Sequence, residues 1–192
     1  MVRRRTAAFI AVLVAAAVLG WSVFTIARRD SATTAGTGGA ATAATAPAGP
    51  PGRKIKARLF YVSDDGVRLT SVEREIAYGE STSDQAREIV TAQLAPVAEP
   101  LVSAVPRGTQ LRALFITDKG EAFVDLSREV VAAHPGGTIN ELLTVYTLVN
   151  ALTANLPAIT AVQLLVDGRE VETLAGHVNL RRAHPKNLTW VQ

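Results

Sequence analysis

The feature that most limits what this chain can form is a long uncharged segment near its N-terminus. Residues 7–27 read AAFIAVLVAAAVLGWSVFTIA and contain no charged side chain. At about 1.5 Å per residue, a helix of this length spans roughly 30 Å, the thickness of the hydrocarbon core of a bilayer. Because the segment has no polar face, it does not fit a helix on the surface of a globular domain. The sequence therefore predicts one transmembrane helix.

The charges beside this segment predict its orientation. Residues 3–5 are three arginines, whereas Arg28, Arg29 and Asp30 follow the segment. This small excess of positive charge favours an N-terminus in the cytoplasm and a C-terminal domain outside it. The alternative is a cleaved signal peptide, but its apolar core is usually shorter, about 7–15 residues, and ends at small residues rather than at two arginines. We expect residues 1–29 to be a single-pass signal-anchor in the cell membrane.

Residues 30–52 have the composition of a flexible tether. After Asp30 they consist of Ser, Ala, Thr, Gly and Pro. Such a segment has no large apolar side chain to bury and cannot offset the entropy lost on ordering. We therefore expect it to be disordered and to separate the anchor from a folded domain.

The charges outside the N-terminal region nearly cancel. From residue 53 onward the chain has 15 Lys and Arg residues and 16 Asp and Glu residues, whereas the whole chain carries a formal net charge of +3. Because a nucleic-acid-binding surface needs clustered positive charge, we expect no nucleic-acid partner. The chain has no cysteine, which excludes disulfides, thiolate metal sites and a lipidated N-terminal cysteine.

Residues 53–183 show the short apolar runs, turns and one-faced helical patterns of a globular domain. The expected strands cover 55–62, 67–78, 111–117, 121–127, 162–166 and 169–174. Each of the two expected helices begins at a capping box and ends before a proline. The first has the box Thr82 and Gln85 and ends before Pro96. The second has the box Thr138 and Glu141 and ends before Pro157. The turns Asp64-Asp65-Gly66 and Asp167-Gly168 predict hairpins.

The order of these elements predicts the fold class. Two ββα units followed by a C-terminal hairpin indicate an α+β domain, in which two helices lie on one face of a mostly antiparallel sheet. The second helix is the expected core helix because apolar residues recur at three- and four-residue spacing: Ile139, Leu142, Val145, Tyr146, Val149, Leu152 and Leu156. We assign residues 184–192 to a C-terminal tail.

No catalytic or metal-binding motif occurs in the chain. The phosphate-loop, dinucleotide, zinc-protease and serine-hydrolase motifs are absent from the sequence. His134, His177 and His184 do not have the spacing of metal ligands, so we predict no metal and no cofactor. Asp125 and Ser127 lie in an expected strand without a base beside them, which favours structural roles. We therefore assign no catalytic residue and predict that the protein is not an enzyme.

Asn150 is the least expected polar residue, because it lies in the middle of the predicted core helix. A buried hydrogen bond that fixes the packing is its favoured role. Exposure to solvent or to a partner is the alternative.

Three stretches of the domain carry a family resemblance. They are AFVDLSREV (Ala122–Val130), GGTINELLTVYTLVNALT (Gly136–Thr153) and VQLLVDGREVETLAGHVNL (Val162–Leu180). Their order and spacing resemble the GerMN domain of bacterial sporulation and spore germination proteins, over about residues 54–183. The resemblance implies a domain outside the cytoplasm with no established catalytic activity, similar to small modules that build rings in envelope-spanning assemblies. Unlike some members, this chain has one copy and no lipidated cysteine.

Three functional hypotheses follow. The leading one is a non-catalytic interaction or scaffolding module of the cell envelope, anchored through residues 7–27, that assembles with itself or with other envelope proteins. The second is a domain that binds cell-wall material or a small polar ligand through the loop Glu99–Gln110 and the turn His134–Gly137. A hydrolase that uses Asp125, Ser127 or His177 is the least favoured.

Overall fold

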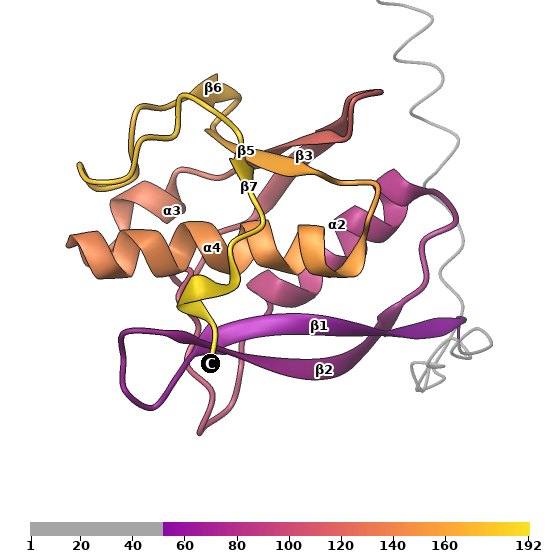
Figure 1. Ribbon diagram of the computed structural model, residues 1–192, viewed down its shortest axis with the longest axis horizontal. Helices are drawn as coiled ribbons and strands as arrows, with labels where there is room; N and C mark the ends of the chain where they lie inside the picture. Colours follow the sequence, from indigo (N-terminus) through magenta and orange to yellow (C-terminus); the bar gives the residue numbers. More distant parts are fainter. Residues whose placement is uncertain (1–51) are drawn as a thin grey trace, which may run out of the picture. The chain divides into compact units, whose positions relative to one another are not determined.

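The computed structural model describes residues 52–192, in which two β-sheets enclose a layer of helices (Figure 1). The strands are β1 (Lys54–Val62), β2 (Leu69–Ala77), β3 (Leu111–Ile116), β4 (Glu121–Leu126), β5 (Ala161–Val166), β6 (Arg169–Glu170) and β7 (His184–Pro185). The helices are α2 (Thr82–Leu94), α3 (Glu129–Ala132), α4 (Thr138–Asn155) and a 3₁₀ helix, Leu188–Trp190. The predicted membrane segment 7–27 and nearly all of the tether lie outside these residues. Within residues 52–192, no helix has both the length and the apolar character to cross a bilayer.

The strands form two sheets, and the prediction of a single sheet is wrong. One sheet is the antiparallel pair β1–β2, and the other has the order β3-β4-β5-β6, with β7 also paired to β5. All its strand pairs are antiparallel except β4–β5, which is parallel. Short turns join antiparallel neighbours, whereas the long connection through α4 returns the chain in the same direction. The α+β class is confirmed, with one mixed and one antiparallel sheet.

Helix α4 lies at the centre of the domain. It packs against β1 of one sheet and β5 of the other, while α2 packs against α4 and β3. Figure 1 shows both helices between the two sheets, so they cover one face of each sheet rather than one face of a single sheet. Because α4 has neighbours on several sides, Leu143, Leu148 and Leu152 are all 1% exposed or less. The prediction that this segment is the core helix is confirmed.

The first helix begins one residue earlier than predicted. Ser81 is the N-cap of α2, and its hydroxyl accepts a hydrogen bond from the Asp84 N–H while the Asp84 carboxylate bonds back to Ser81. Ser81 has the extended backbone that an N-cap requires. Gln85, expected in the capping box with Thr82, instead donates to the carbonyl of Ala77 at the end of β2.

The outer edge of β1 is closed by side chains instead of another strand. The amide of Gln93 accepts from the N–H of Phe60 at 2.9 Å and donates to its carbonyl at 2.7 Å. Asn155 makes the same pair of bonds with Arg58, both at 2.8 Å. These amides satisfy backbone groups that would otherwise be free to pair with another chain.

The C-terminal residues pack against the domain. Strand β7 pairs with β5, and the N–H of Gln192 donates to the carbonyl of Leu69 at 2.9 Å. The amide of Asn150 donates to the carbonyl of Asn187 at 2.8 Å and accepts from its N–H at 3.0 Å. Residues 184–192, predicted as a tail, are therefore held by both sheets and by α4, and the structural role predicted for Asn150 is confirmed.

Candidate functional site

A hollow lies beside the connection between α2 and β3. It has a volume of about 540 Å³. It is lined by Leu94, Ala95, Pro96, Val97, Glu99, Leu101, Val102, Ser103, Ala104, Val105, Pro106, Arg107, Gly108 and Pro135. We call it the loop groove. The two segments predicted to form a binding site, the loop Glu99–Gln110 and the turn His134–Gly137, meet here.

Hydrogen bonds from two elements, β1 and α4, fix the walls of the loop groove. Pro96 stops α2, and the loop then pairs with the end of β1 through a bond from the Val62 N–H to the Val102 carbonyl at 2.8 Å. Farther along, the hydroxyl of Thr144 on α4 donates to the carbonyl of Ala104 at 2.7 Å. The loop is therefore tied to β1 and α4 on either side of Ser103, which favours a preformed groove.

The groove offers apolar contact rather than reactive groups. Most of its lining side chains are aliphatic or proline, and Val102 is 56% exposed. The hydroxyl of Ser103 is engaged with the N–H and carbonyl of Val105 in its own loop. Glu99 and Arg107 are exposed at the groove and join none of the ion pairs of residues 52–192. This lining suits recognition of another surface and provides no general base beside a nucleophile.

His134 stabilises the turn that contributes Pro135 to the groove. The N–H of Gly136 donates to Nδ1 of His134 at 2.9 Å, so the neutral ring carries its proton on Nε2, which lies 3.2 Å from the Thr144 hydroxyl. Burial of the ring lowers the pKa of His134, an effect that the nearby Glu141 carboxylate opposes and His177 reinforces. The turn residue predicted at this position is thus a hydrogen-bonded neutral histidine.

We expect the stability of the domain to decrease between about pH 7.5 and 5.5 because of His134. Its pKa is lower in the folded state than the unfolded value of about 6.5, so its contribution is complete above pH 6.5 and is lost as the pH falls toward the folded pKa. In His134→Asn, a non-titrating acceptor for the Gly136 N–H remains. Urea unfolding at both pH values should show a weaker pH dependence in the variant. If the free energy of unfolding changes equally between the two pH values in variant and wild type, His134 does not cause the pH dependence.

A buried carboxylate holds the loop that follows β6. Oε1 of Glu141 accepts from the N–H groups of Leu174 at 2.6 Å and Ala175 at 3.0 Å, and Oε2 accepts from the N–H of His177 at 2.8 Å. Burial favours the neutral acid, but these bonds outweigh it and lower the pKa of Glu141. The strand predicted over 169–174 ends at Glu170 because these backbone donors bind Glu141 instead of a neighbouring strand.

The helix start explains why this carboxylate is free to reach the loop. Gly137, not Thr138, is the N-cap of α4, and it makes no side-chain capping bond. Glu141 therefore lies one position beyond the place where it could complete the predicted capping box. Nδ1 of His177 lies 3.3 Å from the Glu141 carboxylate, so this ring faces an acid.

Asp125 and Ser127 both have structural partners. Oδ1 of Asp125 accepts from the N–H of Gly168 at 2.7 Å and Oδ2 lies 3.3 Å from Nε of Arg112, which fixes the β5–β6 turn to β4. The hydroxyl of Ser127 accepts from the Gln110 N–H at 3.0 Å and lowers the pKa of Glu129 by hydrogen bonding to that carboxylate. No hydrogen bond joins either residue to a histidine within residues 52–192.

His184 also has a structural position. Its Nε2 lies 2.9 Å from the carbonyl of Asn179, and its ring meets Tyr146 edge-on with centroids 6.0 Å apart. In the part of the chain that the structure describes, no three histidine or acidic side chains gather as a metal site would require.

The sequence pattern of the Germane family, described as sporulation and spore germination, matches residues 58–172, more than half of the chain. The chain belongs to the Germane family. The resemblance to GerMN domains, stated from the stretches Ala122–Val130, Gly136–Thr153 and Val162–Leu180, is confirmed.

Solved structures show the same fold for this Germane domain. The tandem GerMN domains of the sporulation protein GerM from Bacillus subtilis match it with a TM-score of 0.54 at 17% identity, over 70% of this chain and 46% of that one. The first GerMN domain of GerM matches with a TM-score of 0.50 at 17% identity, over 69% and 98% of the two chains. This chain thus spans about half of the tandem structure. No curated protein matches it.

The Germane domain uses two polar residues that sequence reasoning did not single out for these roles, Glu141 and Gln93. Both are fully buried on helices. A glutamate or glutamine at an apolar position of a helix indicates a buried hydrogen-bonding role, because such a side chain is rarely buried without partners. The pattern does not identify the partners, which lie 33 residues or more away in the sequence.

Proposed function

We propose that the chain is a membrane-anchored, non-catalytic interaction module of the bacterial cell envelope, whose Germane domain binds a protein partner through the loop groove. The observation that carries this proposal is the apolar lining of the groove, which is held by bonds to β1 and α4. The uncharged segment 7–27 supports anchoring, and the charges beside it support a domain outside the cytoplasm.

The occupied polar groups support a role without catalysis. Asp125, Ser127 and His177 bind Gly168, Gln110 and Glu141, respectively, so each candidate of the hydrolase hypothesis already fixes a turn or a loop. The proposed partner is another envelope protein or a second copy of the chain. A protein surface can cover an apolar groove, whereas a small polar ligand needs several fixed polar groups around it.

We expect Val102→Arg to weaken the proposed interaction in intact cells. Val102 is exposed in the groove wall, so the arginine places a charge where the partner's apolar surface would bury it. Chemical crosslinking of the full-length chain should yield about tenfold less crosslinked product, the factor that ~1.4 kcal/mol of binding free energy produces. Val131→Arg on α3, also at an exposed valine but outside the groove, should keep the wild-type level. Equal crosslinking by both variants would contradict the proposal.

The second candidate function is binding of cell-wall material or a small polar ligand. The exposed Glu99 and Arg107 at the groove favour it, because opposite charges can orient a polar ligand. Sedimentation of the full-length chain with purified peptidoglycan distinguishes the two functions. Retention that Arg107→Ala abolishes would support ligand binding, whereas the interaction module should stay in the supernatant.

A further inference from the structure

The second sheet has a face that no helix covers. Side chains of Leu114, Val124 and Leu164 are buried on the face toward α2 and α4. The alternate residues of β3, β4 and β5 lie on the opposite face. Figure 1 shows no described helix on the side of this sheet away from α4. We call this side the outer sheet face, made by Ala113, Phe115, Phe123, Asp125, Ala161, Gln163 and Leu165.

Two phenylalanines and a glutamine form a row across the centre of the outer sheet face. Phe115 on β3 is directly opposite Phe123 on β4, and Phe123 is directly opposite Gln163 on β5. Phe115 is 61% exposed, the highest value among the exposed large apolar side chains of the described domain. One exposed phenylalanine is ordinary on a protein surface, but here Phe115 forms a cross-strand pair with Phe123 on a face that no described helix covers.

The buried amide of Gln163 also points to a ligand on this face. The residue is only 7% exposed, yet its Nε2 is buried without a hydrogen-bond partner. A buried amide without a partner destabilises the folded state, and most buried polar groups avoid this situation. The terminal torsion of glutamine is soft, so the amide can turn toward an acceptor placed on the face at little energetic cost.

The size of the face argues against a second copy of the chain as the occupant. Three strands about 4.8 Å apart and five residues at about 3.3 Å each give a face of roughly 14 by 16 Å. This is about 230 Å², whereas a stable dimer buries about 800 Å² on each partner. The face therefore fits a short segment rather than a domain.

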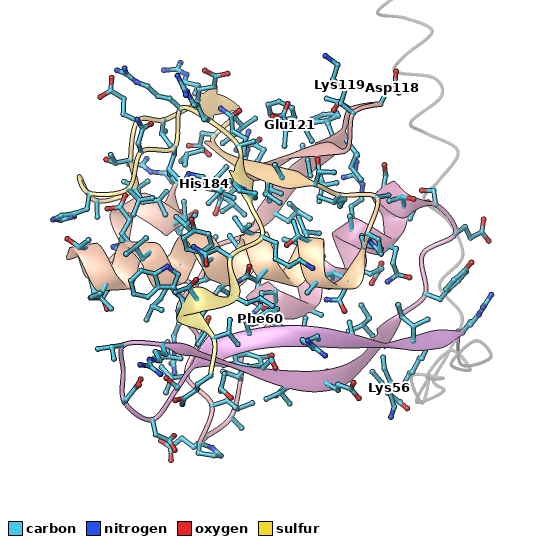
Figure 2. The ribbon with its side chains drawn as sticks, viewed as in Figure 1. Lys56, Phe60, Asp118, Lys119, Glu121 and His184 are labelled. Atoms are coloured by element: carbon cyan, nitrogen blue, oxygen red, sulfur yellow. The ribbon has the colours of Figure 1, made fainter. Side chains whose placement is uncertain are left out.

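The free donor and the charges around the face define the chemistry of that segment. A helix uses its backbone carbonyls internally, whereas an extended segment has free carbonyls to accept from Gln163. Asp118, Lys119 and Glu121 lie at the hairpin end of the sheet, where Figure 2 shows them, and their charges are of both signs. No single charge on the occupant is favoured.

We propose that the outer sheet face binds an extended apolar segment, about five residues long, of a partner protein. A large side chain of the segment covers Phe115 and Phe123, and one of its backbone carbonyls accepts a hydrogen bond from the Gln163 amide. This surface is separate from the loop groove, so the inference does not rest on the function proposed for the groove.

The test uses a phage-displayed library of random seven-residue peptides against the full-length chain in lipid nanodiscs, with empty nanodiscs to remove membrane binders. Selected peptides are then synthesised as acetylated amides, and their affinities are measured by fluorescence anisotropy. We expect enrichment of peptides with large apolar residues and an affinity at least about tenfold lower for Phe115→Ser, an exposed site where folding is unaffected. Val131→Ser, at an exposed valine of α3 outside both the outer sheet face and the loop groove, should bind as the wild type.

Gln163→Leu separates binding from stability. Removing the unpartnered amide should raise the melting temperature by roughly 3–6 °C, while peptide affinity decreases by about fivefold or more because a donor is lost. A purely structural Gln163 would give no decrease in affinity. Failure to enrich apolar peptides, unchanged binding by Phe115→Ser, or equally weakened binding by Val131→Ser would overturn the proposal.

Discussion

Glu141→Gln should lower the free energy of unfolding by about 2–4 kcal/mol, because it replaces hydrogen bonds to a charged acceptor and leaves buried backbone donors unsatisfied. In the wild type the carboxylate accepts from the backbone N–H groups of Leu174, Ala175 and His177 at 2.6 to 3.0 Å. The glutamine has one oxygen, and its amide N–H groups would face these donors. Some of the donors would then be buried without an acceptor.

Urea unfolding at pH 7 measures this loss, and amide hydrogen exchange locates it. Exchange at Leu174, Ala175 and His177 should accelerate more than exchange in β3 and β4. Glu170→Gln makes the same change of charge at an exposed position and should alter stability by less than about 0.5 kcal/mol. A loss below about 1 kcal/mol for Glu141→Gln would contradict the role assigned to this carboxylate.

Gln93→Leu is expected to cost about 2–4 kcal/mol, because it leaves both backbone groups of Phe60 without partners. Leucine has nearly the same volume, so the loss reports hydrogen bonding rather than a cavity. Phe60 is itself fully buried, and Figure 2 shows its side chain between β1 and the helices, where water does not replace the lost bonds. Lower stability would also populate unfolded molecules in which the edge of β1 can pair with another chain.

Urea unfolding and light scattering check the two consequences. Gln110→Leu, at an exposed glutamine, is the matched control and should leave stability within about 0.5 kcal/mol of the wild type. We expect the Gln93 variant alone to scatter light on storage at high concentration. Wild-type stability in Gln93→Leu would show that the amide does not hold the edge.

Local signals predicted the elements of the fold well. Asp167-Gly168 predicts a hairpin turn, and both residues adopt the positive φ that such a turn requires, 50° and 74°. Pro96 and Pro157 each lie just beyond the last turn of a helix. These turns and helix ends depend on a few consecutive residues, so they can be predicted from the sequence alone.

The arrangement of the strands depends on contacts that local patterns do not contain. Strand β4 pairs with β5 in parallel because α4 separates them in sequence, and no residue in either strand identifies the other as its partner. Likewise, the strand predicted over 169–174 has suitable residues for a strand, but Glu141 binds the backbone beyond Glu170. A hydrogen-bonding residue 33 positions away overrides the local pattern there.

In the candidate site, too, local sequence predicts the segments but not how they come together. Prolines and glycines marked Glu99–Gln110 as a loop, and the same reasoning marked His134–Gly137 as a turn. Their meeting in one groove depends on the bond from Thr144 to the Ala104 carbonyl, which joins residues 40 positions apart. Composition identifies both segments, and only the fold brings them together.

Photocrosslinking from within the loop groove tests the proposal that the Germane domain binds a protein there. A photoreactive phenylalanine analogue replaces Val102 in the full-length chain in intact cells, and the same analogue at the exposed Glu170 outside the groove serves as the control. We predict that position 102 crosslinks to one defined segment of an envelope protein or of a second copy, and that position 170 does not. The absence of a protein crosslink at position 102, or the same products from both positions, would show that the groove does not bind a protein.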